Sequence, residues 1–74
     1  MEIAPRIEVD AQRGFGKPVV KGTRVPVSLV LGQLASGMST EEVMQEYDLA
    51  REDILACLSY AAQAIDTEEV RAFR

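Results

Sequence analysis

The stretch GKPVVKGTRVPV, residues 16–27, decides the fold of this chain. Two short arms, Val19–Val20 and Arg24–Val25, contain three β-branched valines and flank a turn that contains Gly22. β-branched residues favour strands, and glycine adopts the positive φ that a tight turn requires. The prolines beside these arms cannot donate ladder hydrogen bonds, which limits the arms to short or edge strands. The stretch therefore predicts a short β-hairpin.

The segment before this stretch predicts little further regular structure. Ile7–Val9 alternates apolar and polar side chains, which indicates a short strand. Residues 11–16 contain two glycines close together and are expected to form a loop. Residues 1–6 are expected to fray.

Three helices are predicted after the hairpin. Apolar residues at helical spacing indicate a helix over about 28–35, with Gly37 as its left-handed cap. Ser39 and Glu42 have the spacing of a capping box that begins a second helix. A third helix is expected from about Arg51 to Ile65. The short connection before this longer helix is typical of a helix-turn-helix.

We therefore predict a mainly α fold, with a short N-terminal β-hairpin followed by a three-helix, helix-turn-helix unit. The 74 residues form one domain, with the strand and hairpin region at 7–27, the helices at 28–65 and a tail at 66–74. A single core of this size is thin, so a homodimer is expected.

The third helix is predicted to be apolar on two sides. Its core face holds Ile54, Leu58, Ala61, Ala62 and Ile65, and its polar face holds Glu52, Ala56, Ser59 and Gln63. A third side is again apolar and is predicted to contact a partner through Cys57, Tyr60 and Ala64. The alternative is that the chain's own hairpin covers this side.

Composition excludes several classes of function. The chain has no His and one Cys, no paired carboxylates at a strand end and no phosphate-binding glycine motif, so we expect no enzyme, metal, cofactor or small-molecule substrate. Cys57 is interpreted as a small packed hydrophobe. Without a signal peptide or a membrane span, the expected location is the cytoplasm.

Charge is unevenly distributed along the chain. Residues 1–26 carry five basic and three acidic residues, a net charge of +2, whereas residues 27–74 carry three basic and nine acidic residues, a net charge of −6. Any DNA phosphate contact is therefore expected from Lys17, Lys21 and Arg24. The polar face of the third helix offers one Gln, one Ser and an acid, which makes it a poor reader of bases. The alternative is that these charges only solvate the surface.

The run GKPVVKGTRVPV and the later LVLGQLASGMSTEEVMQEYDLAREDILACLSYAA resemble domain-of-unknown-function family 433 over about residues 7–65. The resemblance implies a homeodomain-like helix-turn-helix and a prokaryotic type II antitoxin that binds a PIN-like nuclease toxin, represses its own operon by binding operator DNA, or does both. The alternative is a protein-interaction module whose degenerate helix-turn-helix does not bind DNA. Members commonly have Thr or Ser where this chain has Ala50, a change that costs a helix cap worth about 1 kcal/mol.

The C-terminal tail is a further candidate for the toxin contact. Val70 and Phe73 are apolar within an otherwise polar segment. We expect them to anchor the tail on the toxin, beside the acidic residues Asp66, Glu68 and Glu69. The alternative is that Phe73 folds back onto the chain's own core.

Overall fold

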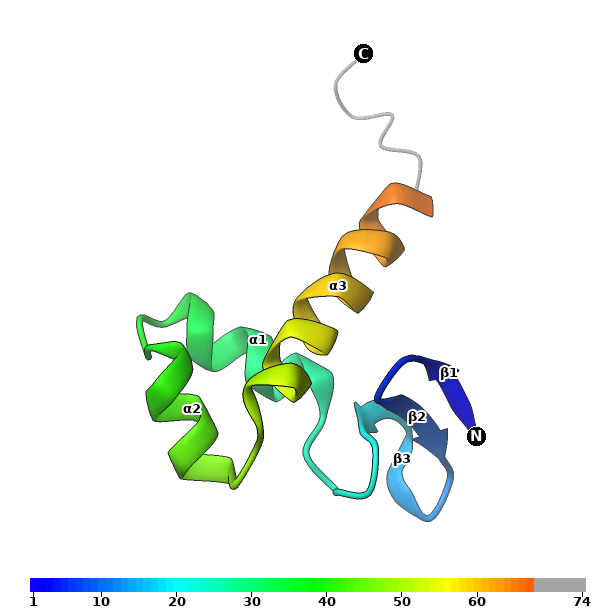
Figure 1. Cartoon of the computed structure of the whole chain (residues 1–74). Helices are drawn as coiled ribbons and strands as arrows, with labels where there is room; N and C mark the ends of the chain where they lie inside the picture. The colour runs from blue at the N-terminus through cyan, green and yellow to red at the C-terminus, as the bar shows by residue number, and fades with distance from the viewer. Residues whose placement is uncertain (68–74) are drawn as a thin grey trace.

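The computed structural model describes residues 1–67, apart from the side chains at positions 13, 14 and 67. Three strands come first, β1 (Glu2–Ala4), β2 (Ile7–Asp10) and β3 (Arg13–Val20). Three helices follow, α1 (Val27–Ala35), α2 (Thr40–Tyr47) and α3 (Arg51–Thr67) (Figure 1). The strands form one antiparallel sheet in the order β1-β2-β3. The fold is therefore α+β: the three predicted helices are present, but the prediction of a mainly α fold with a short hairpin is wrong, because the strand region is a three-stranded sheet.

The main hairpin lies earlier in the chain than predicted. It joins β2 to β3, with Ile7 opposite Val20 and Val9 opposite Pro18. The Asp10 carboxylate accepts a hydrogen bond of 2.8 Å from the Gln12 N–H and so stabilises the turn. The register then shifts between Val9 and Asp10, so that residues 14–17 bulge from β3. Because β3 begins at Arg13, most of the loop expected over residues 11–16 belongs to this strand.

The predicted hairpin exists only as a turn. Gly22 has a φ of +80°, as its position required, and Val20 donates its N–H to the Val25 carbonyl at 2.9 Å. A single bridge between Val19 and Pro26 follows, and the chain then enters α1. Pro26 cannot extend a ladder, so the second arm ends after one bridge.

The first residues pair with the sheet, contrary to the expected fraying. The Met1 amino group donates to the Val9 carbonyl at 3.1 Å, and the Val9 N–H donates to the Met1 carbonyl at 2.9 Å. Strand β1 therefore extends the β2–β3 hairpin by one strand.

The helices follow their sequence signals closely. Gly37 has a φ of +109° after α1. The Ser39 Oγ accepts from the Glu42 N–H at 3.1 Å, and the Glu42 carboxylate accepts from the Ser39 N–H at 2.8 Å, so the capping box is confirmed. At the start of α3, where Ala50 lacks a capping side chain, the Asp53 carboxylate accepts the Ala50 N–H at 2.9 Å. Half of a capping box therefore remains.

A small core lies between the sheet and the helices. Helix α1 packs against β3, and α3 packs against β2, α1 and α2. The core side chains are aliphatic except for one thiol: Ile7, Val20, Val27, Val30, Val43, Leu49, Ile54 and Cys57. Burial of an aliphatic side chain of this size contributes about 1.5–3 kcal/mol. Within residues 1–67, no helix has the length and apolar character needed to cross a membrane.

Helix α3 buries a different face from the one predicted. Ile54 and Cys57 are fully buried, whereas Leu58 is 44% exposed and Ile65 is 62% exposed. Figure 1 shows why: only the first half of α3 crosses the body, and its second half projects beyond the other elements. The predicted core face was therefore wrong for Leu58, Ala62 and Ile65, which are exposed, because α3 packs its Ile54 and Cys57 side against the sheet and the other helices.

Candidate protein-binding surfaces

The three cations predicted to contact DNA lie on β3 and the segment after it, but one of them is already paired. Lys21 Nζ lies 3.2 Å from a carboxylate oxygen of Glu2. The other Glu2 oxygen accepts the Arg6 N–H at 2.9 Å. This backbone hydrogen bond, followed by the hydrogen bond and charge of Lys21, lowers the pKa of Glu2. Lys17 and Arg24 are exposed, and within residues 1–67 neither forms an ion pair.

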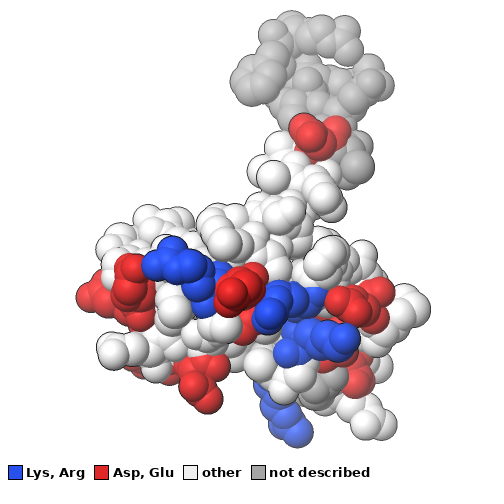
Figure 2. All heavy atoms as spheres, in the orientation of Figure 1, with Lys and Arg blue, Asp and Glu red and all other residues white. Residues whose placement is uncertain are grey.

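Acidic side chains are interspersed among the basic ones. A second ion pair joins Arg6 Nη1 to Asp53 Oδ1 at 2.8 Å, and a third joins Arg51 Nη2 to Glu41 Oε2 at 2.8 Å. Figure 2 shows red and blue side chains alternating across the body of the molecule on the face in view. This face therefore has no continuous basic surface for a phosphate backbone.

An apolar groove lies between β3, α1 and the second half of α3. Its volume is about 510 Å³. Apolar and small side chains form most of the lining, with one lysine among them: Lys17, Pro18, Val27, Ser28, Leu31, Tyr60, Ala61, Ala64 and Ile65. Two of the predicted partner residues, Tyr60 and Ala64, are therefore brought together here.

Cys57, the third predicted partner residue on α3, does not belong to this groove. Its side chain is fully buried in the core of the chain and cannot contact a partner there. Burial, with a smaller effect of the Asp53 charge, raises the pKa of the thiol to about 11. Cys57 is therefore a packed, protonated thiol, and the hypothesis of a partner contact at this position was wrong.

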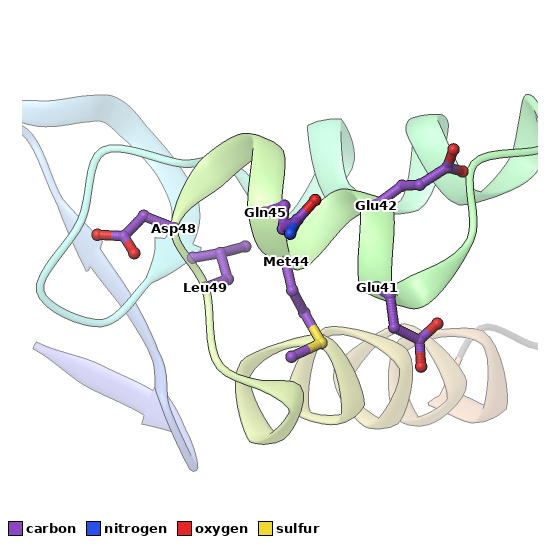
Figure 3. Close-up of a pocket in the computed structure, with 6 residues that line it drawn as sticks. All are labelled: Glu41, Glu42, Met44, Gln45, Asp48 and Leu49. Carbon is purple, nitrogen blue, oxygen red and sulfur yellow. The ribbon is translucent and has the colours of Figure 1, made fainter.

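An acidic surface covers α2 and the turn after it. A shallow depression of about 560 Å³ is lined by Glu41, Glu42, Met44, Gln45, Asp48 and Leu49. Figure 3 shows the carboxylates of Glu41, Glu42 and Asp48 pointing in different directions, while Met44 points toward α3. Within residues 1–67, no three acidic, His or Cys side chains are grouped to hold a metal ion. The surface therefore presents dispersed negative charge.

Two exposed apolar features were missed by sequence reasoning. Phe15 is 92% exposed at the bulge of β3, with a φ of +54°. Its neighbours Gly14 and Gly16 were a signal for irregular backbone at this position. Leu55, on the outer side of α3, is 54% exposed although sequence reasoning gave it no role. The remaining predicted partner residues, Val70 and Phe73, lie outside the described residues.

Comparison with known families gives a match over most of the chain. The profile of the family described as "Protein of unknown function (DUF433)" matches residues 7–61. The chain belongs to this family. The sequence resemblance to the DUF433 family is thereby confirmed, and the family's description assigns no activity.

One solved structure is similar to this DUF433 chain. The crystal structure of Rv2018 from Mycobacterium tuberculosis shares 33% sequence identity with it and superimposes with a TM-score of 0.65. The match covers 70% of this chain and 24% of that one, so this chain spans about a quarter of the length of Rv2018. No curated protein matches the chain.

Proposed function

We propose that this protein is a type II antitoxin that acts by binding a protein partner, a PIN-like nuclease toxin. The family resemblance suggests the class of partner, and the acidic surface over α2 carries the proposal. Glu41, Glu42, Glu46 and Asp48 are all exposed there. A nuclease needs basic groups to hold its nucleic acid, and an acidic protein surface attracts the same groups.

Two of the four carboxylates on this surface, those of Glu46 and Asp48, are available to a partner. Glu41 is paired with Arg51, and Glu42 closes the capping box. Within residues 1–67, neither Glu46 nor Asp48 forms an ion pair. The free carboxylates are exposed and solvated, so they mainly increase the rate of association and select for a basic partner.

Binding to protein without binding to DNA is the better supported form of this proposal. The surface over α2 repels phosphate, and the predicted DNA contact Lys21 is engaged by Glu2. Acidic side chains lie on both sides of the basic ones on the face in Figure 2. These observations favour an interaction module over an operator-binding protein.

The test is co-purification with, and neutralisation of, the small nuclease-like protein that the resemblance predicts to be encoded beside this chain. Gln45→Lys/Glu46→Lys raises the net charge of the acidic surface by three, because it adds two positive charges and removes one negative charge. Glu52→Lys/Gln63→Lys makes the same change in net charge on the exposed polar face of α3 and serves as the matched control. We expect the first variant to lose about tenfold or more in affinity, since like charges at an interface cost more than 1.4 kcal/mol.

Two outcomes would contradict the proposal. If the unaltered chain neither binds nor inhibits the neighbouring nuclease, the antitoxin function is wrong. If both variants lose the same affinity, net charge alone drives binding, and α2 is not the contact surface. Helix content measured by circular dichroism must match the unaltered chain in both variants.

A further inference from the structure

The apolar groove between α1, β3 and α3 contains both a cavity and a protruding side chain. Val27, Leu31 and Ala61 contribute to the cavity, and Ile65 stands at its edge with 62% of its surface exposed. Helix α1, which forms one wall, has no charged residue among its nine positions. In Figure 2 the projecting part of α3 is mostly uncharged. An apolar groove with an exposed hydrophobic side chain at its edge is a candidate for a protein–protein contact.

The groove can be covered by an identical groove. A two-fold axis would place the projecting turns of one α3 along the groove of the other chain. Each copy would then insert its Ile65 side chain into the cavity of the other copy, and the same contact would form twice. Such an isologous contact needs only one surface per chain.

The charges at the rim favour this occupant. Lys17 lines the groove, and Asp66 follows Ile65 on α3. Both side chains are exposed, and within residues 1–67 neither forms an ion pair. A second copy that inserts its Ile65 carries an Asp66 toward Lys17 of the first copy, and the symmetry repeats the pair. The surface therefore complements itself in charge as well as in shape.

From these observations we infer that the chain forms a two-fold symmetric homodimer through this groove, with Ile65 and Asp66 of each copy against the groove and Lys17 of the other. The dimer also joins two small cores across α3, which compensates for the limited burial of a 74-residue chain. It leaves the acidic surface over α2 outside the contact. The dimer does not depend on the antitoxin proposal.

The first experiment measures mass in solution by sedimentation equilibrium, using the whole chain without any partner. The unaltered chain should have about twice its 8.1 kDa mass at micromolar concentration. Ile65→Lys should raise the dissociation constant by about tenfold or more, because a lysine cannot be desolvated in the apolar cavity. Leu55→Lys is the matched control, since Leu55 is similarly exposed on the same helix but lies outside the groove. It should leave the dimer intact.

The second experiment tests contact between the two copies. Lys17→Glu and Asp66→Lys each place two like-charge pairs in their own homodimer, so each variant alone should dissociate more readily. Mixing the two variants restores opposite charges at both contacts and should give a heterodimer about as stable as the original. This result also shows that both variants are folded.

Specific outcomes overturn the inference. A monomer across the micromolar range would leave the groove to a different protein partner. Equal dissociation by Ile65→Lys and Leu55→Lys would place the contact elsewhere on α3. A mixture that stays as weak as its components would show that Lys17 and Asp66 do not meet. Because no toxin is present, these results are independent of the test for toxin binding.

Discussion

Arg6, in the turn between β1 and β2, donates a 2.8 Å charged hydrogen bond to Asp53 in the first turn of α3, across 47 residues of sequence. The other oxygen of Asp53 accepts the Ala50 N–H at 2.9 Å. One carboxylate therefore caps α3 and ties it to the sheet. It also explains how the chain tolerates alanine at the cap.

Asp53→Ala should destabilise the fold more than Arg6→Ala. The arginine change removes only a partly exposed ion pair, worth about 0.2–1 kcal/mol. The aspartate change also leaves the Ala50 N–H without its acceptor, and loss of a cap adds about 1 kcal/mol. Urea unfolding of both variants checks the order. The loss of unfolding free energy in Asp53→Asn, which can still accept the Ala50 N–H, should fall between the losses in the other two variants. A loss in Asp53→Ala no greater than that in Arg6→Ala would show that the cap contributes nothing.

Because Cys57 is buried, its thiol should be unreactive in the folded chain, and the stability of the fold should fall at alkaline pH. Its folded pKa is raised from 9.0 to about 11. The unfolded chain therefore releases the thiol proton at lower pH than the folded chain does. The contribution of the protonated Cys57 thiol to the unfolding free energy is complete below about pH 9. It is lost as the pH rises through the folded pKa of the thiol.

Two measurements check this behaviour. A thiol reagent should label Cys57 only after denaturation, and rapid labelling of the native chain would contradict its burial. Cys57→Ala should be less stable at neutral pH, because it leaves a small cavity. The difference in unfolding free energy between the two chains should narrow between pH 9 and 11.

Local signals predicted the helices correctly. The capping box at Ser39 and Glu42 and the glycine cap at Gly37 depend only on residues within four positions of each other, so the sequence contains all the required information. The choice of buried face on α3 is different in kind. Cys57 and Leu58 are both apolar, so helical spacing alone does not show which of them is buried. The direction in which α3 crosses the body decides which side chain enters the core.

The sheet was predicted poorly because its pairing is not local. Glu2–Ala4 and Arg13–Lys17 lack the alternation of a half-buried strand. Glu2–Ala4 becomes a strand by pairing with β2, and β3 begins at Arg13, which pairs with Asp10 on the far side of the bulge. The sequence signal for the β2–β3 turn at Asp10 was missed because Gly22 gives a stronger signal for the turn after β3. The apolar groove combines side chains from β3, α1 and α3, so sequence spacing on α3 alone identified only Tyr60 and Ala64.

Any binding to duplex DNA should be weak and should depend on phosphate contacts. Changing Lys17, Lys21 and Arg24 together to glutamine should weaken binding to all sequences and reduce the salt dependence by up to about one counterion per lost contact. Ser59→Ala/Gln63→Ala should matter less, since these side chains lie on the poor polar face of α3. Fluorescence anisotropy at several salt concentrations measures both effects. The opposite order would show that α3 contacts bases.

Removal of residues 68–74 should weaken toxin binding. The segment lies outside the described structure, and the prediction depends on its sequence: Val70 and Phe73 are apolar among charges, with Glu68 and Glu69 beside them. An aromatic anchor in an interface often costs 2 kcal/mol or more when it is cut to alanine, so Phe73→Ala should reproduce much of the loss. Melting temperature separates the two explanations of the tail. If Phe73 contacts the toxin, neutralisation falls while the melting temperature of the free chain stays constant. If Phe73 instead packs on its own core, Phe73→Ala lowers the melting temperature together with neutralisation. Full neutralisation by the truncated chain would show that the tail does not contact the toxin.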